Sequence, residues 1–284
     1  MSFDLFLDIA KDAVLDSIKV FVFVFAFHML LSFFEDRIAA ILVSRRNKAP
    51  VFGALFGLIP QCGTSVLASD LYVRGLLSMG TLLAAFLSCS DEAVIIIMTS
   101  GKSLNMLPLL LGLKFAIGTV VGLAVNAFVK NAGSDSLDEG AVHYEGHAHS
   151  ETKLVAHVLH PLHHSLGIFV YVLVINLVLG VIIGLAGEDT LVSFISSGRY
   201  FAPLLASIVG LVPNCASSVL LTELYLNGSL AFGSLLAGLL VNSGLGVLIL
   251  FKKKSTVANA FVIVGISFAV SVVAGYVTSF AMGF

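Results

Sequence analysis

The chain has 284 residues, of which 58% are hydrophobic and only 11% are charged, and its mean hydropathy is +1.05. Soluble domains have about 45–50% apolar and about 25% charged residues, so this composition excludes a soluble protein and indicates an integral membrane protein. The net charge of −2 leaves no basic face of the kind that binds nucleic acid, which excludes nucleic acid as a partner.

Residues 1–16 predict an amphipathic helix that lies along the membrane surface. Aspartates recur in it at every fourth position and therefore share one helix face, with apolar side chains on the other: they are Asp4, Asp8, Asp12 and Asp16. An external acidic patch that gathers cations is the alternative. A cleavable signal peptide would begin with basic residues, so we do not expect one.

Six later segments are apolar and long enough to cross a bilayer, whose hydrocarbon core of about 30 Å needs about 20 helical residues. They are residues 17–35, 76–99, 104–129, 165–186, 229–251 and 258–283. Four shorter apolar pieces lie between them, at residues 50–59, 61–73, 200–212 and 214–226. Spans and shorter pieces together predict an all-α membrane protein with about ten transmembrane segments.

The shorter pieces form two pairs, which meet at Pro60 and at Pro213. Proline removes a backbone N–H and clashes with the preceding turn. Each pair is therefore predicted to be two half-length helices that meet at a break. A re-entrant hairpin and two tilted spans both fit this pattern.

The two breaks share a motif, which recurs after 153 residues. Pro60-Gln61-Cys62-Gly63-Thr64-Ser65 matches Pro213-Asn214-Cys215-Ala216-Ser217-Ser218, and the register extends to Asp70 and Glu223. Broken hydrophobic segments at corresponding places in two halves are typical of secondary transporters. Each half crosses the membrane an odd number of times, so residues 17–129 and residues 165–284 are predicted to be two inverted repeats.

Lysine and arginine residues concentrate on the side of the membrane that holds the loop of residues 130–164. Cytoplasmic loops carry this excess of positive charge. The loop is therefore predicted to be cytoplasmic, with both termini outside, in a multi-pass protein of the inner (plasma) membrane.

The duplicated polar motifs predict a substrate site near the middle of the bilayer, at which both breaks meet. Helices that start after the prolines would direct free N–H groups toward it. We expect the substrate-binding residues to be Gln61, Cys62, Thr64, Ser65, Asn214, Cys215, Ser217, Ser218, Asn242 and Ser243. Close packing of small polar residues between helices is the alternative explanation.

Charged residues inside predicted spans are functional candidates because burying a charge in the bilayer is costly. Asp91 and Glu92 lie deep in one span, and Lys114 has a similar depth in the next. Proton coupling and a static ion pair are both compatible with this set. Asp70 and Glu223 each follow their proline by about 15 Å of helix, which places them near the membrane surface as gates or ion-pair partners, Asp70 with Arg74.

Two groups of residues are candidate metal ligands. The first lies within the apolar segments and combines thiols with carboxylates: Cys62, Cys89, Asp91, Glu92 and Cys215. The second lies in or just after the central loop, where closely spaced imidazoles are typical of metal binding: His143, His147, His149, His157, His160, His163 and His164. A flexible polar linker is the alternative for the loop.

The paired proline–amide–cysteine motifs, the acidic-Leu-Tyr sequence after each, and the histidine-bearing loop give the chain a resemblance to a known family. Over roughly residues 17–284 it resembles the ten-helix heavy-metal exporters, which are similar to arsenical permeases and manganese transporters. The resemblance implies export of a metal or metalloid, with Cys62 and Cys215 as the matching motif cysteines. Carboxylate and amide oxygens favour manganese, and thiols favour arsenicals.

These patterns predict a secondary-active, proton-coupled exporter of a divalent metal such as manganese, or of an arsenical, with no cofactor. A homodimer is left open. An ion-coupled transporter of a small organic anion or metabolite is the main alternative. The chain has no P-loop. We do not expect an enzyme, because nothing in the spacing of His28, Ser65 and Asp70 supports a triad, and a structural membrane protein would not need duplicated polar breaks.

Overall fold

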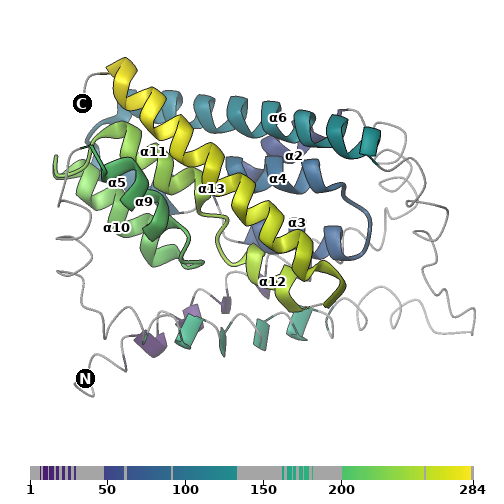
Figure 1. Cartoon of the computed structure of the whole chain (residues 1–284). Coiled ribbons are helices and arrows are strands. Elements are labelled where there is room, and N and C mark those ends of the chain that lie inside the picture. The colour runs from purple at the N-terminus through teal and green to yellow at the C-terminus, as the bar shows by residue number, and fades with distance from the viewer. Residues whose placement is uncertain are drawn as a thin grey trace, which may run out of the picture.

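The computed structural model describes residues 48–60, 63–90, 92–132, 200–252 and 254–282, together with scattered residues between 7 and 29 and between 162 and 181. Within these ranges every regular element is a helix (Figure 1). The predicted surface helix, the spans at residues 17–35 and 165–186, and the central loop lie largely outside the described residues.

The described helices form two series along the chain. The first contains α2 (Ala49–Gly57), α3 (Gly63–Val73), α4 (Met79–Ser88), α5 (Glu92–Ser100), a short 3-10 helix (Leu104–Met106) and α6 (Leu107–Ala132). The second contains α9 (Ala202–Gly210), α10 (Cys215–Leu226), α11 (Phe232–Val241), α12 (Gly246–Lys252) and α13 (Lys254–Met282). The predicted all-helical class is confirmed for the described part of the chain.

Both predicted proline breaks are present. Helix α2 ends three residues before Pro60, and α9 ends three residues before Pro213. The residue before a proline is driven away from the helical region of backbone conformation, so neither helix can run through. The next helices, α3 and α10, begin within three residues of these prolines.

Two further breaks, which we did not predict, interrupt the predicted spans at residues 76–99 and 229–251. Between α4 and α5 the amide of Ser90 leaves the helical pattern and donates to the carbonyl of Gly57 at 3.1 Å. Between α11 and α12 the side-chain oxygen of Asn242 accepts from the amide of Gly244 at 2.8 Å. The asparagine side chain offers the backbone an alternative to helical bonding, and Gly244 has a φ of +56°, which suits glycine. Both segments are still long and apolar enough to cross a membrane, as predicted.

Four segments of the described chain are long and apolar enough to cross a membrane. They are Met79–Ser100, Leu104–Phe128, Phe232–Lys252 and Thr256–Met282, close to four of the predicted spans. The two that contain a break are 81% and 83% buried within the protein, whereas the segments of α6 and α13 are each only 22% buried. The broken spans therefore lie inside, and the long helices α6 and α13 cover them with one side facing outward (Figure 1).

The packing contacts repeat between the two series. Helix α4 packs against both α2 and α6, and α11 packs against both α9 and α13. Close approach of α4 and α6 depends on small residues, since a Cβ on Gly122 would lie 2.5 Å from the carbonyl oxygen of Gly80. Between the series, α3 packs against α12, α10 packs against α5, and α4 touches α11.

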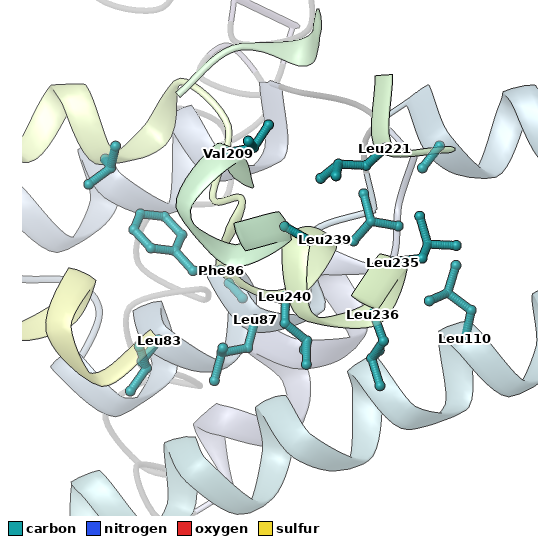
Figure 2. Packing of buried hydrophobic residues seen from close by; sticks show 14 of the residues in the cluster. Leu83, Phe86, Leu87, Leu110, Val209, Leu221, Leu235, Leu236, Leu239 and Leu240 are labelled. Carbon is teal, nitrogen blue, oxygen red and sulfur yellow. The ribbon is translucent and has the colours of Figure 1, made fainter. Parts of the chain in front are cut away.

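A large apolar cluster joins the two series. Figure 2 shows its side chains, which come from α4, α6, α9, α10 and α11: Leu83, Phe86, Leu87, Leu110, Val209, Leu221, Leu235, Leu236, Leu239 and Leu240. Eight of the ten are at most 1% exposed, which leaves Val209 and Leu239 slightly more accessible. The broken spans supply many of these core residues. The polar groups at their breaks therefore lie close to apolar side chains.

Candidate functional site

The first turns of α3 and α12 touch each other directly. Gly246 opens α12, and a Cβ built on it would lie 2.4 Å from the carbonyl oxygen of Ser65. Only a residue without a side chain permits this approach. The proline break before α3 and the second-series break before α12 therefore meet, although they are far apart in the sequence.

Helix α10 begins with a cap made by its own motif. The side chain of Asn214 accepts from the amide of Ala216 at 3.3 Å, and the hydroxyl of Ser217 donates to the carbonyl of Asn214 at 2.7 Å. Asparagine is a favoured N-cap residue because its oxygen satisfies an amide that the helix leaves unbonded. The side chains of Asn214 and Ser217 therefore stabilise the start of the helix.

Asn242 fastens the break between α11 and α12 to the first turn of α10. Its side-chain nitrogen donates to the hydroxyl oxygens of Ser217, at 3.2 Å, and Ser218, at 2.6 Å. Its oxygen accepts from Gly244, as described above. Asn242 is buried, and both N–H groups of its side chain are used in hydrogen bonds. A buried and fully bonded amide of this kind fixes the positions of the groups around it. Three of the predicted substrate residues are thus brought into contact.

The side chain of Cys215 lies among apolar groups where these elements cross. It packs with Val66 of α3, with Leu245 of the break, and with Ile249 of α12. Cys89 is also buried and forms the C-cap of α4. Among the described residues no three or more histidine, cysteine, aspartate or glutamate side chains lie together as a metal-binding group.

Several members of the predicted site lie outside the described residues, so their positions stay predictions. They are Gln61, Cys62, Asp91 and the loop histidines His143, His147, His149, His157, His160, His163 and His164. Glu92 begins α5, and the structure describes its backbone but not its side chain. Thr64 and Ser65 occupy the first turn of α3 and are buried, and Ser243 is buried in the break beside Asn242.

Lys114 links α6 to both broken spans. Its buried ammonium group donates to the carbonyl of Cys89 at the end of α4, and to the carbonyl of Leu239 in the last turn of α11 at 2.8 Å. The hydroxyl of Ser88 donates in turn to the carbonyl of Lys114 at 3.1 Å. Lys114 is thus buried within the protein, and the two carbonyls come from different series.

The two acidic residues at matching positions in α3 and α10 have different surroundings. Asp70 is buried and forms the expected ion pair with Arg74, with 2.8 Å between its carboxylate oxygen and the guanidinium Nε. Glu223 is exposed. Because Asn227 stands where Arg74 would correspond, α10 has no arginine at the equivalent place.

Several residues of this region were not predicted from the sequence. Ser88 and Ser90 hold the first-series break, Gly246 permits the contact with α3, and Asn259 of α13 donates to the hydroxyl oxygen of Tyr72 at 3.0 Å. A signal for the breaks was present, since Ser88-Cys89-Ser90 and Asn242-Ser243-Gly244 both interrupt apolar runs. The other contacts depend on distant partners.

A match to a known family extends over nearly the whole chain. A family model described as "Putative, 10TM heavy-metal exporter" matches residues 2–188 and residues 166–282. No curated protein and no solved structure matches the chain. The apolar helices, the buried broken spans and this match agree, and the chain therefore belongs to this family of ten-span membrane proteins described as heavy-metal exporters.

Proposed function

We propose that this protein is a secondary-active transporter that exports a metal or metalloid across the inner membrane by proton-coupled alternating access. The substrate is a divalent metal such as manganese, or an arsenical. The observation that supports the proposal is that helix breaks from both series meet inside the protein, at the polar residues Ser65, Ser217, Ser218 and Asn242, which we call the polar layer. Irregular backbone survives at membrane depth where it lines a substrate path or is packed in protein.

Two inverted repeats are the architecture that we propose for this transporter. The support is the regular correspondence of helices at an interval of 153 residues, for example α4 with α11 and α6 with α13. The packing is reciprocal as well, because α3 contacts α12 while α10 contacts α5. A relation of this kind places equivalent half-helices on both sides of a shared site, and small rotations of one repeat against the other then open it to alternate sides.

The donor set that we propose for the substrate combines soft and hard groups. Cys62 and Cys215 contribute thiols at matching places of the two motifs, and hydroxyl and amide groups of the first turns contribute oxygen atoms. Asp91 and Glu92 add negative charge near the break that Cys89 opens. We rank manganese or a neighbouring divalent metal above arsenicals, because carboxylate oxygens suit such ions. The loop histidines would gather metal on the cytoplasmic side.

Proton coupling in this scheme uses Asp91 and Glu92, whose predicted depth in the membrane is similar to that of Lys114. Protonation of Asp91 or Glu92 in one state and release in the other would change the charge that the substrate meets by one unit. Asp70 and Glu223 lie farther along their helices, where the ion pair of Asp70 with Arg74 acts as a gate. The protein then works with the termini outside and the central loop in the cytoplasm.

Transport of a small organic anion or metabolite is the second candidate. It is favoured by the positive ends of α3 and α10, which begin at the polar layer. Against it, the ammonium of Lys114 is bonded to two carbonyls, and the amide of Ala216 is bonded to Asn214. A metal substrate uses the thiols and carboxylates that an anion would not.

The test is survival and metal content of whole cells with and without the gene, across manganese, zinc, nickel, cobalt, arsenite and antimonite. We expect cells that carry the gene to tolerate at least one of these ions better and to hold less of it. The matched control carries Asp91→Asn together with Glu92→Gln, which should retain the metal load. Identical tolerance and content for every ion in all strains would contradict the proposed export.

A further inference from the structure

The ammonium group of Lys114 lies between the carboxyl ends of two helices. Cys89 is the C-cap of α4, and Leu239 lies in the last turn of α11, which ends at Val241. Carbonyls at these positions have no amide one turn ahead to bond with. Each helix end carries the equivalent of about half a negative charge, so two ends together complement about one positive charge. The bonds from Lys114 to both carbonyls match this arithmetic.

Main-chain carbonyls at the ends of broken helices are also the ligands that many transporters use for a small monovalent cation. An alkali ion and a primary ammonium ion both bind carbonyl oxygens and carry one positive charge. We propose that the ends of α4 and α11 form a monovalent-cation site and that the tethered ammonium of Lys114 fills it in place of a dissolved ion. This inference rests on the proposed function. With the site filled by Lys114, the proposed exporter needs neither sodium nor potassium.

Nearby contacts hold the tether in register. The hydroxyl of Ser88 donates to the carbonyl of Lys114 at 3.1 Å, and a Cβ on Gly118 would lie 2.4 Å from that same hydroxyl oxygen. Helix α6 is thus fixed against the break at the residue that carries the ammonium. Lys114 is 2% exposed, so its charge is removed from bulk water and needs polar groups of the protein, among them these two carbonyls.

The matching position of the second series carries no charge. Ser267 lies 153 residues after Lys114 on α13, is 3% exposed, and its hydroxyl has no hydrogen-bond partner among the described residues. The site is therefore single rather than duplicated.

The test uses purified full-length protein in detergent and its unfolding temperature. Wild type and Lys114→Ala are compared in chloride salts of sodium, potassium, methylammonium and choline at equal ionic strength. Choline is bulky and has no N–H group, so it serves as the reference salt. The alanine variant empties the site and leaves room for a small cation, and Lys102→Ala, which removes an exposed lysine before α6, is the matched control.

We expect wild type and Lys102→Ala to unfold at the same temperature in all four salts. Lys114→Ala should unfold earlier in choline and recover with methylammonium or an alkali cation, in a saturable rise on the order of 5 °C at about 100 times the Kd. If Lys114→Ala does not survive extraction in choline, the yield of folded protein is compared across the same salts. Equal losses in every salt, by either measure, overturn the proposal.

The readout needs no transport and no knowledge of the substrate. A wild-type protein that exports no metal in cells would contradict the proposed function while leaving the cation response of Lys114→Ala intact. Conversely, a metal exporter whose Lys114→Ala variant responds to no cation would retain its function and lose this inference.

Discussion

The side-chain amide of Asn242 lies 2.6 Å from the hydroxyl oxygen of Ser218, and this bond ties the break between α11 and α12 to the first turn of α10. A second bond to Ser217 and a third to the amide of Gly244 complete the side chain's hydrogen bonding. A break held at one residue by three bonds is a well-defined element, and substitutions there have distinct consequences.

Replacing Asn242 with alanine should lower the free energy of unfolding by about 1–3 kcal/mol, because it leaves buried hydroxyl and amide groups without their partner. The unfolding temperature in detergent measures this loss. Ser243→Ala is the control at the next position, which is equally part of the predicted substrate set. It should unfold close to wild type and reduce metal export, whereas equal stability of both variants would contradict the role given to Asn242.

Gly246→Ala should destabilise the contact between α12 and α3. The new Cβ would lie 2.4 Å from the carbonyl oxygen of Ser65, so one of the two helices must move, at a cost of about 1–3 kcal/mol. Gly265→Ala on α13 is the matched control, since nothing lies within 4 Å of its Cβ position. Alanine favours helix there. An unfolding temperature of Gly246→Ala at or above that of Gly265→Ala would show that the contact is not tight.

Arg74→Ala should destabilise the protein more than Asp70→Asn does. The arginine side chain is 29% exposed and the aspartate side chain 6% exposed, so removing the arginine leaves a buried carboxylate without this partner. We expect a loss of about 1–3 kcal/mol for Arg74→Ala, between the values for surface and fully buried pairs.

The control for this ion pair is Glu223→Gln, at the corresponding and exposed position of α10. Exposed substitutions usually change stability by less than about 0.5 kcal/mol. Unfolding temperatures in detergent compare the three variants. If Glu223→Gln costs as much as Arg74→Ala, the ion pair of Asp70 is not what stabilises this end of α3.

Substrate chemistry is separated by comparing carboxylate and thiol variants in cells. For a divalent metal such as manganese, Asp91→Asn with Glu92→Gln should abolish the decrease in cellular metal content, because oxygen ligands and negative charge hold such ions. Cys215→Ala should keep most manganese export and lose tolerance to arsenite. Loss of manganese export by Cys215→Ala alone, with unchanged export by the carboxylate variant, would reverse our ranking of the two substrates.

The sequence predicts those features whose cause lies in one residue or its near neighbours. Pro60 and Pro213 interrupt the middle of their apolar segments, because the missing N–H and the ring clash belong to proline itself. The ion pair of Asp70 with Arg74 follows from a spacing of four residues on a helix. The exposed position of Glu223 agrees with the asparagine found where its partner would be.

Features that depend on distant partners could not be predicted. The break after Ser88 is held by a bond from Ser90 to Gly57, and the break after Val241 by bonds from Asn242 to α10. The hydropathy of a span is an average over about 20 residues, so a polar string of three residues does not show in it. The acceptors of Lys114 are main-chain carbonyls, which leave no mark in the sequence because every residue has one.

Helix α6 combines two roles. Its span is only 22% buried and so presents a broad side to the acyl chains, while Lys114 on its other side reaches the ends of α4 and α11. Helices answer a change in hydrocarbon thickness by tilting. Thinning or stiffening the surrounding lipid would therefore displace the ammonium relative to its two carbonyls, which makes the lipid composition a determinant of how firmly the broken helices are held.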